Sequence, residues 1–346
     1  MSNFLGTAAI IIVLWSVRNW LVHGLRVVRN REPWLPWEPR RAVPWGAIDL
    51  VMTVILLLVL ANFVMGGIGW VYPDSKTLKP ADFSAGLQMS LIAGESLIKV
   101  LAAAGAVVLI SLRLRAAAGD WGWQPTKLWD DFKLGLIAFT MIVPPVYMVQ
   151  GLIVLGGKWE SKHPLIEMLK KTPGGELYLV SFIAAVIVAP LVEEWAFRVL
   201  LQGWLEKLFS GVHSLESLLV GDQVASEPSA ALLVPTPTQE NPYGELSPAE
   251  GTEAPVVAKF AEPKPLSETS AQSERERWQA WLPIGVSASL FAAAHVSHGP
   301  DFIALFLLSL GQGYLYQRTH RILPVIVVHL LLNLFSMLAV AAALVS

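Results

Sequence analysis

Residues 46–71 read GAIDLVMTVILLLVLANFVMGGIGWV, and Asp49 is the only charged side chain among them. A helix of about 20 apolar residues crosses the roughly 30 Å hydrocarbon core of a bilayer. This stretch is long enough to do so. It shows no alternation of polar and apolar side chains, which argues against a strand of an outer-membrane barrel. It therefore predicts a transmembrane helix.

The composition of the whole chain agrees with this prediction. Of the 346 residues, 54% are hydrophobic and 15% are charged, whereas about 25% of the residues of a soluble domain are charged. The net charge of -2 provides no basic field for a nucleic-acid partner. The chain has no cysteine, which excludes disulfides, thiolate metal sites and a cysteine nucleophile. Any chemistry must come from Glu, Asp, His, Ser, Asn and Arg.

We expect an all-α fold, a polytopic membrane helix bundle of about eight transmembrane helices, four of them within residues 1–176. The pair Pro144-Pro145 predicts a kink or break in the fourth. The N-terminus lacks the pattern of a signal peptide, so we expect the first segment to be retained. The eight segments lie near residues 3–17, 46–71, 87–112, 134–156, 177–203, 281–297, 301–317 and 322–345.

The basic residues predict an orientation in the membrane. Seventeen of the 25 Lys and Arg residues fall in the first, third, fifth and seventh connections between these segments. Because cytoplasmic connections carry the excess of Lys and Arg, the odd connections are expected in the cytoplasm and both termini outside. We expect a multi-pass protein of the cell membrane, in a bacterium the inner membrane.

Residues 211–280 separate the fifth and sixth segments and differ in composition. Between 221 and 270, eight prolines lie among Ser, Thr, Ala and Glu, and eight acidic residues accompany only two lysines. Such a segment buries too little apolar surface to offset its ordering entropy, so we expect a disordered cytoplasmic insert. A solvated spacer and a docking segment for a partner are the two interpretations.

An ionisable side chain inside an apolar segment costs free energy when it is inserted into a membrane, so its presence needs an explanation. Within 177–210, Glu193 and Glu194 are followed by Arg198. Glu194 and Arg198 are separated by four residues, so they lie on one helix face and can form an ion pair. Glu193 points about 100° away and has no such partner on its helix. It is a candidate general base, with a structural role in a salt bridge as the alternative.

The C-terminal segments, within residues 281–346, carry two further polar pairs. Phe291 precedes His295 by four residues, and His329 precedes Asn333 by four residues. His329 and Asn333 share a helix face, so both can address one point in the bundle interior. A single buried histidine is usually a packing residue. Three helices that each present acid, imidazole or amide groups favour a reaction site.

The three motifs EExxxR (Glu193, Glu194, Arg198), FxxxH (Phe291, His295) and HxxxN (His329, Asn333) occur in this order on apolar segments. In this respect the chain resembles the CAAX protease and bacteriocin-processing (CPBP) family of intramembrane endopeptidases, which includes the Ras-converting CAAX prenyl endopeptidase. The resemblance covers about residues 177–340. The first four segments match the family poorly, and the 211–280 insert is longer than the family pattern.

The resemblance implies an enzyme that hydrolyses a peptide bond of a membrane-associated protein or peptide, with a CAAX-like or a bacteriocin or leader-type substrate. It implies that Glu193 and His295 activate a water molecule. His329 and Asn333 then stabilise the oxyanion, while Glu194, Arg198 and Phe291 support and orient them. The resemblance favours a metal-free glutamic mechanism, although the family was long labelled metalloproteases. If a metal takes part, zinc held by Glu193, His295 and His329 is the alternative.

Two hypotheses are alternatives to a protease function. The chain could be a catalytically silent membrane scaffold, or a proton-coupled transporter that uses Glu95, Lys99, Glu193 and the histidines as a proton path. Glu95 and Lys99 are separated by four residues and are most simply a self-neutralising pair. Motifs of other intramembrane proteases, such as HExxH and GxSxG, do not occur. The expected partners are the lipid bilayer and a membrane-associated substrate; the sequence defines no oligomeric state.

Overall fold

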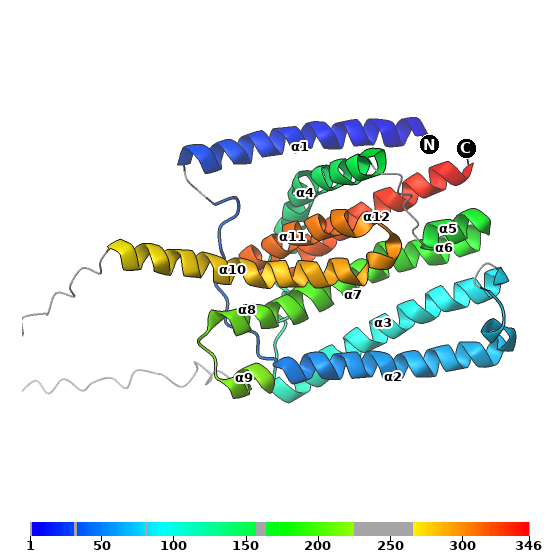
Figure 1. Ribbon diagram of the computed structural model, residues 1–346, viewed down its shortest axis with the longest axis horizontal. Coiled ribbons are helices and arrows are strands. Elements are labelled where there is room, and N and C mark those ends of the chain that lie inside the picture. Colours follow the sequence, from blue (N-terminus) through cyan, green and yellow to red (C-terminus); the bar gives the residue numbers. More distant parts are fainter. Residues whose placement is uncertain are drawn as a thin grey trace, which may run out of the picture.

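The computed structural model describes residues 2–30, 33–79, 82–156, 164–172, 174–224 and 266–345, and its elements there are helices. The long helices run side by side as a bundle (Figure 1), which confirms the predicted all-α membrane fold. Six described helical segments are long and apolar enough to cross a membrane. They are α1 (Ser2–Asn30), α2 (Ala47–Val71), α3 (Ala85–Leu114), α4 (Leu128–Gly156), the continuous segment from α6 to α8 (Gly175–Ser210) and α12 (Ile322–Val345).

The other two expected segments are also helical, as α10 (Leu266–Ala294) and α11 (Asp301–Thr319). In α10 only residues 280–294 form a short apolar stretch, and α11 is not among the six candidate spans. Polar residues such as Gln312, Gln317 and Arg318 lie in its second half. Eight membrane-spanning helices therefore stay a prediction, while each of the eight expected segments contains a helix.

The expected boundary of the first segment at residue 17 is wrong, since helix α1 continues to Asn30. No proline occurs before Pro33 to interrupt it. Helix α1 docks on α4, where the Trp20 indole Nε1 donates to the Met141 carbonyl at 3.1 Å. That carbonyl lacks its usual helical donor because residue 145 is a proline. The prediction there was a kink or a break, and helix α4 continues through Pro144 and Pro145 without a break.

The connections before α2, before α4 and before α12 meet at one end of the bundle, opposite to both termini (Figure 1). Arg41 forms two hydrogen bonds of 2.8 and 2.7 Å to the carboxylate of Asp120. Glu38 accepts from Arg321 at 2.7 Å. Two basic residues of the odd connections, Arg41 and Arg321, thus lie at this end of the bundle, where acidic residues neutralise them.

The fifth segment is one continuous helical rod with two wide turns. Helices α6 (Gly175–Phe182), α7 (Ala189–Glu194) and α8 (Gly203–Ser210) are joined by π-helical stretches at Ile183–Val188 and Trp195–Gln202. Single π-helical turns inside helices occur frequently at functional sites. Here they flank the six residues that end in Glu193 and Glu194.

The structure orders both ends of the 211–280 insert, where disorder was expected. Helix α9 (Leu215–Leu219) follows α8, and Lys207 holds Asp222 at 2.8 Å. Gly221 forms a bridge with Trp45, which is fully buried. Buried contacts made from outside the insert therefore order residues 211–224, and residues 266–280 belong to α10. Residues 225–265 lie outside the described part of the chain.

Candidate active site

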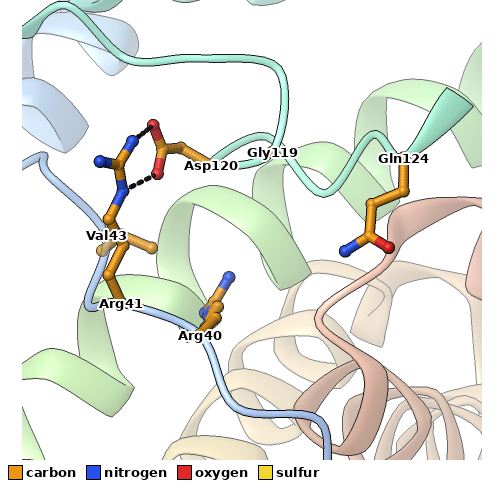
Figure 2. Close-up of a pocket in the computed structure, with 6 residues that line it drawn as sticks. All are labelled: Arg40, Arg41, Val43, Gly119, Asp120 and Gln124. Carbon is orange, nitrogen blue, oxygen red and sulfur yellow. Dashed lines mark hydrogen bonds and ion pairs between the residues drawn. The ribbon is translucent and has the colours of Figure 1, made fainter. Parts of the chain in front are cut away.

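A pocket of about 230 Å³ lies between the connection before α2 and the connection before α4, whose residues line it (Figure 2). Its two arginines already have partners: Arg41 is paired with Asp120, and Arg40 binds Glu206 at 2.9 Å and the hydroxyl of Tyr316 at 2.8 Å. Both cations contribute to holding the connection before α2 against the bundle. The acid and histidine groups that the sequence singles out lie elsewhere, in the bundle interior.

Glu194 is the centre of the buried polar cluster and has no exposed surface. Its Oε2 accepts from Arg198 Nε at 3.0 Å, which confirms the predicted ion pair. Its Oε1 accepts from Gln312 Nε2 at 3.0 Å and faces His329 Nδ1 at 2.7 Å. Because a carboxylate only accepts hydrogen bonds, His329 Nδ1 must carry a proton. The remaining ring nitrogen of His329 is Nε2.

Arg198 is equally buried, and the other groups it contacts come from α10 and α11. Its guanidinium donates to Ser309 at 2.7 Å and to Ser287 at 3.3 Å. The Arg198 guanidinium also lies 5.7 Å from the ring centre of Phe291. One cation therefore joins three parts of the bundle and neutralises Glu194.

Glu193 and His295 form a second, more open pair. Glu193 Oε2 lies 3.9 Å from His295 Nε2, and the two side chains are 19% and 17% exposed. His295 Nδ1 lies 2.7 Å from the Phe291 carbonyl, which can only accept, so Nδ1 carries a proton and Nε2 faces Glu193. His295 follows the last residue of α10 and is not inside the helix as expected.

Phe291 connects the two pairs. Its ring is fully buried, with its centre 4.6 Å from that of His295 and 6.1 Å from that of His329. The ring packs tilted on His295 and edge-on to His329. The Phe291 ring therefore contacts both histidines and Arg198 and joins the Glu194 cluster to the pair of Glu193 and His295.

Asn333 is one turn from His329 but binds a different group. Its Nδ2 donates to the Ala185 carbonyl at 2.8 Å. In the π-helical stretch, Ala189 N–H reaches back five residues to Ala184. In the same register, the donor for Ala185 would be residue 190, which is a proline. Asn333 supplies the missing donor. One of the two amide hydrogens of Asn333 is therefore used by a backbone carbonyl, and the described partners of Glu194 do not include Asn333.

Zinc held by Glu193, His295 and His329 is the alternative to a metal-free site. Within the described ranges, no group of three His, Cys, Asp or Glu side chains has the spacing to hold a metal ion. Glu193, His295 and His329 are accordingly not grouped as a three-ligand metal site in the described part of the chain.

Sequence reasoning missed three polar residues of the cluster: Ser287, Ser309 and Gln312, all fully buried. The available signal was Gln312, a polar residue between Gly311 and Gly313 in an apolar helix. A Cβ at Gly313 would lie 2.9 Å from Ile284 and 3.0 Å from Gln202. Glycine at this position allows α11 to approach α10 and the π-helical turn closely enough for these bonds.

The hypothesis of a transporter requires Glu95 and Lys99 in a proton path. These residues form an ion pair of 2.7 Å on α3, and their side chains are 63% and 34% exposed. They are not linked to Glu193 or to either histidine by any interaction among the described residues. This geometry agrees with a self-neutralising pair. Glu193, Glu194, His295 and His329 instead form a cluster with Arg198 that does not include this pair.

Fold and site together define a multi-pass helical membrane protein with an acid and histidine cluster in its interior. Residues 269–335 match the family model described as Type II CAAX prenyl endopeptidase Rce1-like. This match confirms the resemblance in that part of the chain and indicates a CAAX-type endopeptidase, a protease with a peptide or protein substrate. The matched region contains Phe291, His295, His329 and Asn333 but not the EExxxR motif. No curated protein and no solved structure matches the chain.

Proposed function

We propose that this protein is an intramembrane endopeptidase in which Glu193 and His295 activate the attacking water without a metal. The observation that carries the proposal is the 3.9 Å approach of Glu193 Oε2 to His295 Nε2. With Nδ1 protonated, a neutral His295 presents a lone pair to a carboxylate, so two acceptors face each other. A water molecule that donates one hydrogen to each satisfies both groups and is held for deprotonation.

In the proposed reaction, the water oxygen forms a bond to the scissile carbonyl carbon while Glu193 takes one proton. The carbonyl oxygen becomes an oxyanion. His329 is the first candidate donor to it: Nδ1–H is committed to Glu194, so the donor must be Nε2–H of an imidazolium that Glu194 holds in place. Collapse of the tetrahedral intermediate breaks the C–N bond, and the proton on Glu193 passes to the leaving amine.

Asn333 is the second candidate donor to the oxyanion. One of its two amide hydrogens is used by the Ala185 carbonyl, and the other remains for a substrate oxygen. Glu194, Arg198 and Phe291 orient the site in this proposal, since each contacts a group that carries a step. The three donors to Glu194 hold it fixed, which suits a preorganised site.

We further propose that the end of the bundle with the basic connections faces the cytoplasm and that both termini lie outside, in a cell membrane. The support is the excess of Lys and Arg in those connections. The substrate would be a membrane-associated protein or peptide of the CAAX or leader type.

The test is mass spectrometry of peptide products from membranes that contain wild type, Glu193→Gln or His295→Ala. We expect the wild type to cleave a CAAX or leader-type membrane peptide and both variants to lose at least about 100-fold in rate, because general acid–base catalysis contributes at least that much. Matched controls are Glu176→Gln and His213→Ala, which alter an acid on α6 and a histidine after α8. Identical products from all five proteins would overturn the proposal.

Two further arms separate the finer alternatives. Substrate peptides are supplied with a prenylated CAAX cysteine, with the same cysteine unmodified, and with a leader sequence in its place. A chelator is added to the wild type, and we expect unchanged cleavage. Loss of cleavage on chelation, restored by zinc, would refute the metal-free mechanism but leave the peptidase proposal standing.

A further inference from the structure

An apolar groove is lined by residues of α1, α4 and α12. Its residues on α1 and α12 are near the two termini in sequence, and both termini lie at one end of the bundle (Figure 1). The volume of the groove is about 860 Å³. Residues such as Ile12 of α1, Val143 of α4 and Val340 of α12 form its walls. Ala339 and Ala343 also line it, and both are exposed. Small side chains on this face of α12 leave the space that larger ones would fill.

The polar groups in the groove wall already have partners. The hydroxyls of Tyr147 and Ser336 lie 2.9 Å apart, and Ser336 also donates to the Leu332 carbonyl at 3.0 Å. The wall therefore offers no strong site for a polar ligand or for water. An unbranched hydrocarbon chain is the occupant whose surface matches such a wall.

One charged residue, Lys170, lies on the lining of the groove. It belongs to α5 (Pro164–Lys171), whose Leu169 is fully buried and packs with Leu177 and Met337. This packing fixes α5 at the end of α12. The Lys170 side chain is 58% exposed, and its ion pair with Glu167 is long, at 3.5 Å. An ammonium group is thus presented at the rim of an apolar channel.

We propose that this groove is a binding site for one anionic phospholipid, with an acyl chain between α1, α4 and α12 and the phosphate at Lys170. The arrangement is amphipathic in the same sense as the lipid: apolar along its length and cationic at the membrane surface. A basic side chain near a membrane surface attracts an anionic headgroup by about 1 kcal/mol, which corresponds to about fivefold in affinity. This site is independent of the proposed peptidase activity.

The test measures lipid retention by the full chain in detergent, with native mass spectrometry after exchange against phosphatidylglycerol or phosphatidylcholine of identical acyl chains. We expect the wild type to retain one phosphatidylglycerol in preference to phosphatidylcholine. Lys170→Gln should weaken phosphatidylglycerol retention about fivefold. Lys171→Gln, the neighbouring residue that does not line the groove, should change it less than twofold.

A second pair of variants tests the channel itself. Ala339→Phe, which fills the groove, should lower retention of the lipid about tenfold or more. Ala104→Phe, at an exposed alanine of α3 outside the groove, should leave it unchanged. A photoreactive acyl chain on phosphatidylglycerol should label wild-type peptides from α1, α4 or α12, a readout that does not depend on any variant folding.

Three results would overturn the proposal. Equal retention of phosphatidylglycerol and phosphatidylcholine would show that the charge of Lys170 does not favour an anionic headgroup. Equal losses for Lys170→Gln and Lys171→Gln would assign the effect to the general surface field. Photolabelling confined to helices outside the groove would place the lipid elsewhere.

Discussion

Replacement of Arg198 by methionine should destabilise the bundle more than removal of the whole Glu194–Arg198 pair. Both side chains are fully buried, and Arg198 Nε donates to Glu194 Oε2 at 3.0 Å. Methionine fills much of the same space without the charge. Glu194 would then remain as a carboxylate in a dry interior without its cation, supported only by Gln312 and His329.

The expected loss of unfolding free energy follows from the interactions that each variant removes. Removing one partner of a buried ion pair costs about 3–5 kcal/mol, because the other charge is left uncompensated. Arg198 also loses its bonds to Ser287 and Ser309, and hydrogen bonds between membrane helices average about 0.6 kcal/mol each. In the double variant Arg198→Met with Glu194→Gln, the uncompensated charge disappears. Only about 1–2 kcal/mol, chiefly the two serine bonds, should then be lost relative to wild type.

The assay is unfolding by SDS titration, followed through tryptophan fluorescence, since the chain has 14 tryptophans, among them Trp195 beside Glu194. Wild type, each single variant and the double variant form one thermodynamic cycle. The exposed pair Asp130 and Lys133, 3.8 Å apart, is the control cycle, and its coupling should stay below about 0.5 kcal/mol. If Glu194→Gln lowers the stability of the Arg198→Met variant further, the charge-compensation argument is refuted.

Three other predictions concern contacts between helices. Gln312→Leu removes two hydrogen bonds, to Glu194 and to the Val325 carbonyl, so it should cost about 1–2 kcal/mol of unfolding free energy and lower the cleavage rate. Trp20→Phe removes the indole donor to Met141 and should cost about 1 kcal/mol in the same assay. Gly135→Ala places a Cβ 2.6 Å from that of Val327, and this overpacking should cost about 1–3 kcal/mol.

Each of these has a matched comparison. Gln150→Leu removes a similar bond, to Asp301 at 3.1 Å, and should affect stability but not cleavage; equal effects on cleavage would deny Gln312 a positioning role. Pro145→Ala restores an N–H for Met141, so Trp20→Phe should cost almost nothing in that background; an undiminished cost would contradict the assigned role of Trp20. Gly151→Ala meets nothing within 4 Å and should not destabilise.

Features that depend on a single helix could be predicted from the sequence. Hydrophobic stretches of sufficient length predicted the long helical segments, and the four-residue spacing of Glu194 and Arg198 predicted their ion pair. These follow from the helical repeat alone, so no neighbouring helix is needed to infer them. The three motifs also predicted the family that the match at residues 269–335 supports.

Which groups meet across helices depends on how the helices pack. The sequence predicts that Asn333 and His329 lie on the same helix face. Because α12 packs on the wide turn after α6, the Asn333 side chain donates a hydrogen bond to the Ala185 carbonyl. Gln312 and Ser309 gave no family signal, but α11 brings them to Glu194 and Arg198. Contacts between residues more than 100 positions apart depend on helix register and on close approach.

The prolines show most clearly which features the sequence predicts and which depend on helix packing. Pro145 and Pro190 can be read from the sequence, and each leaves one backbone carbonyl of its helix without a donor. The sequence does not say which side chain satisfies that carbonyl. In the folded chain Trp20 supplies the donor to Met141 and Asn333 the donor to Ala185. An unpaired carbonyl is costly in an apolar environment, so each proline creates a need that only the packing of another helix meets.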